Sequence, residues 1–310
     1  MQHRILTGRF ALAAIAAWLV GGAAYAQGGD NPWFKRTDVQ GLLGSYQDSI
    51  ERDRLQNFGV FVRADYLERG GFTVGVNRTV LNQEAGIEDV NQSAVFLSGR
   101  WHLTPDWASG QITLRLDGHA VSNDDPTGDT DDITVFAPQV SYMNFARTFY
   151  ADIGFSRSSF GDSLTNLQKL DVDQVTPTLG LGFNEQRDWL QLRGYFISPS
   201  VPQRAQNESD TSAFEIKWTH WPGSPSMLNV DNYRVAVLGG ERIYAVDHDA
   251  GTIFNLVDLQ TGGVSVGAEW APSERNRILL IVGVEQYEDR SASEEYDHRF
   301  LYLNFTHEWN

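Results

Sequence analysis

The carboxyl-terminal end of the chain alternates between two kinds of side chain over ten residues. One set of alternate positions holds Leu301, Leu303, Phe305, His307 and Trp309, and the other holds Phe300, Tyr302, Asn304, Thr306 and Glu308. Because successive side chains of a β-strand point to opposite faces, this period of two predicts a strand with one apolar and one more polar face. A soluble edge strand can show the same alternation, so the rest of the chain must decide what kind of sheet this is.

The same period of two recurs through nearly the whole sequence. Clear examples lie at 174–184 and 112–120, where apolar residues alternate with Thr, Asn, Gly and charged residues. Similar segments lie at 58–68, 72–81, 92–103, 132–144, 145–158, 188–198, 211–220, 229–247, 252–260, 263–272 and 276–287. With the terminal strand, the sequence predicts about 14 strands of roughly 10 residues, the length that a tilted strand needs to cross a bilayer.

The connections between these segments differ in length. Short turn sequences such as Arg69-Gly70-Gly71 alternate with long polar stretches at 82–91, 123–131, 159–172, 199–210 and 288–298. This is expected if one rim of a barrel carries the long loops. The alternation breaks after residue 210, because the segments between 229 and 260 put the last long loop on the wrong rim. The stretch 237–242 fits either a tight hairpin or a glycine bend in one long strand, so we expect 12 to 16 strands.

Residues 27–56 have a different period. Val39, Leu42, Leu43, Tyr46 and Ile50 are spaced as on one face of a helix, and Thr37 or Asp38 is a candidate amino-terminal cap. This spacing predicts a short periplasmic segment before the barrel. A helical plug or lid, a surface helix and an extra first strand are the three interpretations that it allows.

Residues 1–26 have the pattern of a secretory signal peptide. A basic start with Arg4 and Arg9 precedes the apolar stretch 10–20, and Ala24-Tyr25-Ala26 forms a cleavage site before Gln27. The chain has a net charge of −16, which argues against nucleic acid as a partner. It has no cysteine, so backbone pairing and packing must close the fold without disulfides.

Taken together, the leader, the alternating strands and the terminal stretch Leu-Tyr-Leu-Asn-Phe-Thr-His-Glu-Trp resemble Gram-negative outer-membrane β-barrel proteins of the porin-like class. The resemblance implies an all-β, antiparallel transmembrane barrel over 57–310, placed in the bacterial outer membrane. It implies outer-membrane lipid and the barrel assembly machinery as partners, with Leu301, Leu303, Phe305 and Trp309 as the assembly signal. Interfacial aromatic girdles are typical of such barrels, and the candidates are Trp101, Trp107, Trp189, Trp218, Trp221, Trp270 and Trp309.

Charged residues on the polar faces of the strands are expected to point into a lumen, because an Arg or Lys at the bilayer midplane costs roughly 2 to 4 kcal/mol. The candidate lumen-lining residues are Arg63, Asp65, Arg115, Asp117, His119, Asp152, Arg193, Glu215, Lys217 and Glu285. Glycines on the same faces favour an open lumen: Gly75, Gly154, Gly180, Gly182 and Gly267. A closed barrel with a filled interior is the alternative.

No cofactor-binding motif is present, and no cofactor is expected. The one candidate metal cluster is a set of aspartates with oxygen ligands suited to calcium, Asp124, Asp125, Asp129, Asp131 and Asp132, although their spacing is not that of an EF-hand. His119, His220 and His307 have no serine-nucleophile motif nearby, so catalysis is not expected.

The function that fits best is a channel for small polar solutes. The alternatives are a non-conducting structural or export-complex barrel that binds a partner, and an outer-membrane enzyme acting on lipid or glycan.

Overall fold

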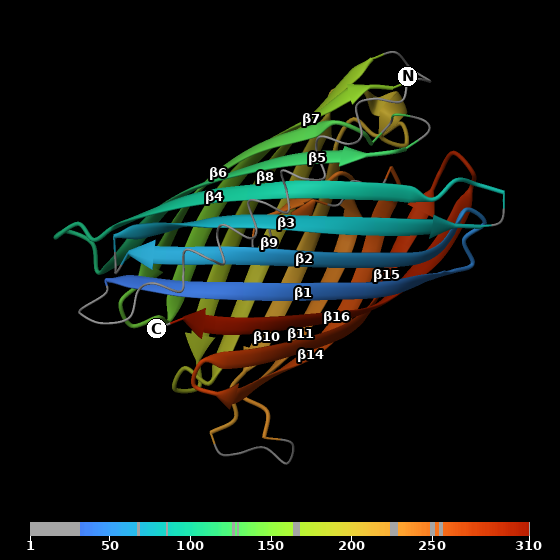
Figure 1. Ribbon diagram of the computed structural model, residues 1–310. Helices are drawn as coiled ribbons and strands as arrows, with labels where there is room; N and C mark the ends of the chain where they lie inside the picture. The colour runs from blue at the N-terminus through green and yellow to red at the C-terminus, as the bar shows by residue number, and fades with distance from the viewer. Residues whose placement is uncertain are drawn as a thin grey trace.

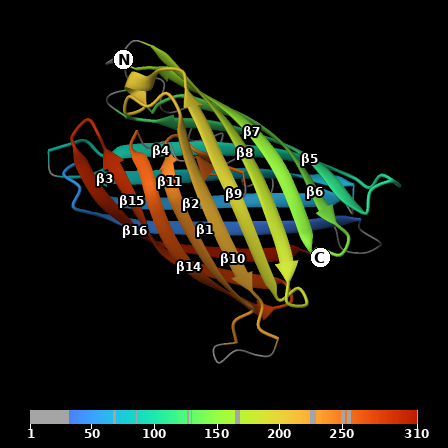
Figure 2. The ribbon, with the colours of Figure 1, turned by 180° about the vertical axis from the view of Figure 1, so that it is seen from behind.

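The computed structural model describes residues 32–66, 69–84, 86–125, 128, 130–163, 168–223, 229–248, 252–253 and 257–309. The predicted signal peptide lies outside these residues. Fourteen antiparallel strands form one closed barrel (Figure 1), and the view from behind shows the same continuous wall (Figure 2). The prediction of an all-β antiparallel barrel of 14 strands is confirmed.

The barrel strands are β1 (Trp33–Gln47), β2 (Arg52–Tyr66), β3 (Gly70–Gln83), β4 (Val90–Leu103), β5 (Gly110–Asn123), β6 (Ile133–Asn144), β7 (Phe149–Asp162), β8 (Lys169–Phe183), β9 (Asp188–Pro199), β10 (Thr211–His220), β11 (Asn232–Arg242), β14 (Leu259–Ser273), β15 (Asn276–Asp289) and β16 (Glu294–Trp309). A 3₁₀ turn, η2 (Pro202–Arg204), follows β9, and the two-residue strands β12 (Val246–Asp247) and β13 (Thr252–Ile253) form a separate sheet. Each barrel strand pairs with its chain neighbours, and β1 closes the ring against β16.

Of the three interpretations of the amino-terminal segment, the extra first strand is confirmed, because residues 33–47 form β1 and the barrel begins well before residue 57. The two helical interpretations are wrong. The apparent helical spacing comes from a strand that is apolar on both faces. Leu43 points outward and is 58% exposed, whereas Leu42 lines the interior cavity described below and Tyr46 is buried. Apolar residues on two opposite faces mimicked one helical face.

The segment predicted as one strand at 252–260 is not a single strand of the barrel: residues 252–253 form β13, residues 259–260 belong to β14, and 254–256 lie outside the described residues. The total of 14 was reached because this segment was counted and β1 was not. The predicted segment 229–247 is shorter as β11, which ends at Arg242. Its glycines form an irregularity between Gly239 and Arg242 rather than a hairpin, and Gly240 has a φ of 98°, which glycine adopts easily.

The two rims differ as the sequence predicted. All five predicted long loops connect strands at the rim opposite the two ends of the barrel sequence, together with the connection from β11 to β14. The terminal rim carries mostly short turns, and the exception is 221–231 between β10 and β11. We therefore assign the terminal rim to the periplasm and the long-loop rim to the outside.

The outer surface of the wall is apolar. Leu114, Leu179, Phe214, Val266 and Leu301 are each at least 40% exposed, as expected for side chains that face lipid. In the described part of the chain, no helix is long and apolar enough to cross a membrane.

The tryptophans of the described chain all lie at or near the periplasmic ends of strands, so the girdle of tryptophans follows one rim. Trp189 is an exception to the predicted girdle, because it points into the barrel, where it lines the interior cavity. Interfacial tryptophans of this kind hold a barrel at a fixed depth in the membrane.

Candidate functional site

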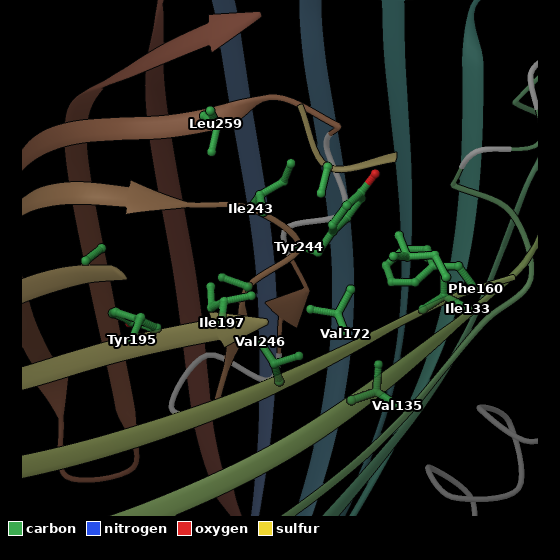
Figure 3. Close-up of a cluster of buried hydrophobic side chains, with 14 of the residues drawn as sticks. Ile133, Val135, Phe160, Val172, Tyr195, Ile197, Ile243, Tyr244, Val246 and Leu259 are labelled. Carbon is green, nitrogen blue, oxygen red and sulfur yellow. The ribbon is translucent and has the colours of Figure 1, made fainter. Parts of the chain in front are cut away.

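The connection between β11 and β14 folds into the barrel, and we call residues 243–258 the inner segment. It is described at 243–248, 252–253 and 257–258, and β12 and β13 pair within it through Val246 and Ile253. Ile243, Tyr244, Ala245 and Val246 are each at most 2% exposed. Figure 3 shows the side chains of this segment packed against residues of the barrel wall.

The inner segment fills one side of the lumen by apolar packing. Its partners are inward-facing residues of β5 to β9, including Ile133, Val135, Phe160, Val172 and Ile197, all at most 2% exposed (Figure 3). Phe160 packs against Tyr244 with ring centroids 4.7 Å apart. These strands are apolar on both faces near their extracellular ends because one face meets lipid and the other meets the inner segment.

Hydrogen bonds and an ion pair hold the segment at the middle of the wall. Gln174 on β8 donates to the carbonyl of Val246 at 2.8 Å and accepts from its amide at 3.0 Å, which imitates a strand partner. Arg193 on β9 forms an ion pair with Asp247 at 3.0 Å and is 1% exposed. Its Nε also donates to Thr178 at 3.1 Å. The predicted lumen-lining residue Arg193 therefore contacts the inner segment and does not face an open lumen.

His248, the next residue of the inner segment, contacts β7 and β5. It is fully buried, and its Nδ1 lies 3.9 Å from a carboxylate oxygen of Asp117. A Cβ on Gly154 would lie 2.5 Å from His248 Nε2, so the imidazole rests directly on the glycine backbone. Glycine at position 154 is thus a requirement for close approach of the inner segment, not a contribution to open space.

The extracellular mouth is crossed by further contacts. Tyr244 donates to the carbonyl of Arg204 at 2.5 Å, and Arg204 donates to the carbonyls of Gly161 and Gln168 in and beside the β7–β8 connection. Arg290 pairs with Glu208 and with Glu241, the latter at 2.8 Å.

On the other side of the mouth, Asp258 accepts from Arg52 of β2 and from Tyr296 of β16. Both ends of the inner segment are therefore tied to the barrel.

A cavity of about 630 Å³ remains beside the inner segment, along β9 to β11, β14 to β16 and β1 to β4. Three carboxylates, three Lys or Arg side chains and one histidine of the described residues line it: Glu215, Asp247, Glu285, Lys217, Arg234, Arg242 and His298. Most are matched locally. Lys217 lies 3.0 Å from Glu215, Arg234 lies 2.5 Å from Glu269, and His298 lies 3.0 Å from Glu285. The cavity wall therefore carries many fixed charges with no surplus of either sign.

Several aromatic rings of the interior lie directly over glycines of the wall. A Cβ on Gly180 would lie 2.4 Å from the indole of Trp189, and one on Gly283 would lie 2.6 Å from the ring of Phe300. Phe61 covers Gly75 in the same way. The predicted role of the inward glycines as empty space is therefore wrong for Gly75, Gly154 and Gly180. They make room for a ring, which then occupies less of the lumen.

The structure places the ten predicted lumen residues on inward faces. Arg63 and Arg100 both pair with Asp65, at 2.5 and 3.0 Å, and Arg115 pairs with Asp117 at 2.8 Å. His119 and Asp152 are buried in the wall. Of the ten, Glu215, Lys217 and Glu285 line the cavity.

Sequence reasoning missed a group of cavity-lining residues: Gln40, Tyr46, Trp189, Arg242, Asp247, His298, Phe300 and Tyr302. The period of two placed Phe300 and Tyr302 on the more polar face of the terminal strand, but the chemistry of that face went unused. Gln40 and Tyr46 were missed because 27–56 was interpreted as a segment before the barrel, and Trp189 was assigned to the girdle. The signal for the inner segment was available in the apolar run Ile243 to Val246, which lacks the length of a membrane strand.

The carboxylates of the aspartate-rich loop between β5 and β6 accept hydrogen bonds from the loop itself and from the ends of β4 and β5. Asp124 accepts from the amide of Asn91 at 2.5 Å, Asp125 accepts from Thr130 and Asp131 accepts from the amide of Asn123. Asp129 lies outside the described residues. Within the described ranges, no three His, Asp or Glu side chains gather as a metal site.

Comparison with solved structures identifies the fold. The toluene transporter TbuX of Ralstonia pickettii matches with a TM-score of 0.51 and 8% identity over 91% of this chain and 90% of that chain. The toluene transporter TodX of Pseudomonas putida matches with a TM-score of 0.50 and 10% identity over 95% and 93%. Omp33 of Acinetobacter baumannii matches with a TM-score of 0.45 and 8% identity over 89% and 99%.

No protein-family model matches the sequence, and a search of curated proteins gives no match. The similarity is therefore one of fold, and the chain has the fold of bacterial outer-membrane β-barrel proteins. That fold and the lipid-facing surface place the protein in the outer membrane.

Proposed function

We propose that this outer-membrane β-barrel conducts small polar solutes through the cavity beside the inner segment. The observation that carries the proposal is the cavity itself. About 630 Å³ of the interior is left open next to the inner segment. This is expected because 14 strands enclose more space than side chains alone can fill.

The polar and charged groups among the aliphatic and aromatic residues of the lining suit solutes that are small and polar. Amide, hydroxyl and charged side chains replace part of the hydration of a passing solute, and flat rings such as Trp189 limit the width. Because acidic and basic groups are balanced, we expect weak discrimination between cations and anions, despite the acidic composition of the whole chain. The inner segment acts as the constriction, with Asp247 as its residue at the cavity.

The test is conductance of the purified barrel in planar bilayers, with one variant that narrows the path. Ser265 lines the cavity, whereas its neighbour Val266 points to lipid and is 49% exposed. We expect Ser265→Trp to lower the single-channel conductance by about half or more, because a large ring then enters the cavity. Val266→Trp is the matched control and should conduct like the wild type.

Recordings of the wild type separate a channel from a non-conducting barrel. The contacts across the mouth, such as that of Arg290 with Glu208, are the observation that favours a closed, non-conducting barrel. If the folded wild type gives no conductance and no solute uptake into liposomes, the channel proposal is rejected and a partner-binding role becomes the better one.

A further inference from the structure

Three arginines point outward on neighbouring strands in the extracellular half of the barrel. Arg299 lies on β16, Arg54 on β2 and Arg78 on β3, and all three are exposed. Interior residues on the same strands fix the outward direction of these arginines. His298 and Phe300 flank Arg299 and line the cavity. Asn57 on β2 and Thr79 on β3 also line the cavity, where Asn57 donates to Thr79, so Arg54 and Arg78 lie on the opposite faces of these two strands. Strands β16, β1, β2 and β3 lie side by side in Figure 1. We call the surface formed by Arg54, Arg78 and Arg299 the outer arginine patch.

The register brings two of these arginines to the same residue of β1. Ser45 is the partner of Arg299 on one side and of Arg54 on the other. Adjacent strands are about 4.8 Å apart, so the two arginine backbones are separated by about 10 Å, with only a serine side chain between them. Two guanidinium groups can therefore reach one ligand above Ser45. Arg78 lies farther along the wall, where it donates to Ser93 and Asn91, each at 3.0 Å.

An apolar surface begins directly below the outer arginine patch. Leu43 and Leu301 are register partners and are 58% and 40% exposed, and Phe58, the partner of Arg78, is 58% exposed. These side chains have the position expected for contact with acyl chains. The arginines therefore lie at the boundary between the apolar band and the outside, where lipid head groups are found.

The charge on this surface is not balanced by the protein. Within the described ranges, Arg78 and Arg299 form no ion pair, and Arg54 pairs only with Asp53 at 3.3 Å, where both side chains are largely exposed. Asp297 is the next outward position on β16 toward the rim. By contrast, the outward Arg157 on β7 is matched by Asp171 at 2.8 Å and Asp173 at 3.6 Å. The guanidinium groups of Arg78 and Arg299 are therefore available to an external anion, which Arg157 with its two carboxylates is not.

We propose that the outer arginine patch binds the phosphorylated head group of an outer-leaflet glycolipid. One phosphate lies between Arg54 and Arg299, a second phosphate or a sugar hydroxyl contacts Arg78, and the acyl chains lie over Leu43, Leu301 and Phe58. Arginine suits this role because its planar guanidinium binds phosphate through two hydrogen bonds. Basic groups near a membrane surface also strengthen lipid binding. Inorganic phosphate lacks the acyl chains that the adjoining surface would contact.

The experiment uses the folded full-length barrel in detergent and measures lipid binding by native mass spectrometry. The probes are a diphosphorylated lipid A, the same lipid after removal of both phosphates, and inorganic phosphate. We expect the wild type to prefer the phosphorylated lipid by about tenfold or more. The variant R54Q/R78Q/R299Q should lose that preference while keeping the heat-dependent gel migration of a folded barrel.

The controls are two other outward basic residues, Lys35 near the periplasmic rim and Arg157 with its own acidic partners. K35Q and R157Q should keep the preference for the phosphorylated lipid. Equal binding of the two lipids by the wild type, an unchanged preference in the triple variant, or binding of inorganic phosphate as tight as that of the lipid would each overturn the proposal. Conductance is not part of the readout, so the result is independent of the proposed channel function.

Discussion

Removal of the Asp247 carboxylate is the most direct test of how the inner segment is held. Arg193 is 1% exposed and lies 3.0 Å from Asp247. Breaking a buried ion pair by removing one partner typically costs about 3 to 5 kcal/mol, because the remaining charge is left in a poorly solvated place. We therefore expect Asp247→Ala to lower the ratio of docked to undocked inner segment by a factor of roughly 10² to several times 10³. The two hydrogen bonds between Gln174 and Val246 and the apolar cluster remain.

Two assays report the position of the segment. Limited proteolysis of the folded barrel should cut Asp247→Ala within 243–258 faster than the wild type, because a docked segment is shielded by the wall. Single-channel recording should show a larger mean conductance with more current fluctuation, because the segment then leaves part of the lumen. Arg193→Gln should act in the same direction, and the double variant should fall short of the sum of the two single effects.

The matched control is the exposed pair of Arg157 and Asp171, which lies 2.8 Å apart with side chains 52% and 38% exposed. Exposed pairs contribute about 0 to 1 kcal/mol, so Asp171→Ala should leave proteolysis and conductance unchanged. Equal proteolysis of Asp247→Ala and the wild type would refute the reasoning, since the ion pair would then not hold the segment. An effect of Asp171→Ala as large as that of Asp247→Ala would show that the assays report general stability instead.

Three further predictions concern other parts of the barrel. Gly154→Val should undock the inner segment, because a Cβ would lie 2.5 Å from His248 Nε2. Gly118→Val should be tolerated, because the atom nearest to its Cβ, a carbonyl oxygen, would be 3.8 Å away. Protease sensitivity at 243–258 compares the two variants, and equal sensitivity would contradict the contact between Gly154 and His248. Trp309→Ala should lower the outer-membrane level more than Trp107→Ala on quantitative blots, because Trp309 donates to Thr37 across the closing pair of strands at a net gain of about 1 kcal/mol, whereas Trp107 is 81% exposed. Glu215→Lys should lower the cation-to-anion permeability ratio at low salt, measured from the reversal potential, with a smaller shift at high salt; Asp117→Lys should instead reduce the folded yield, because Asp117 is 1% exposed beside Arg115 and His248.

The wall of the barrel was determined locally, which is why the sequence predicts it. A strand between lipid and lumen needs alternating side chains, so Leu114 and Leu116 on either side of Arg115 already fix the direction of all three. The same rule fails where both faces are apolar. In β1, Leu42 and Leu43 lie on opposite faces, and nothing in their local spacing separates a two-sided strand from a helix.

The lumen was decided by contacts between residues far apart in the chain. Asp247 meets Arg193, His248 rests on Gly154 and Asp258 bonds to Arg52, and each contact requires the closed barrel to bring its partners together. A period of two shows which residues of a strand point inward, but it does not show which part of the chain lies opposite them in the lumen. Whether an inward charge faces water or a folded-in segment therefore depends on the tertiary structure, since these contacts join residues 54 to 206 positions apart.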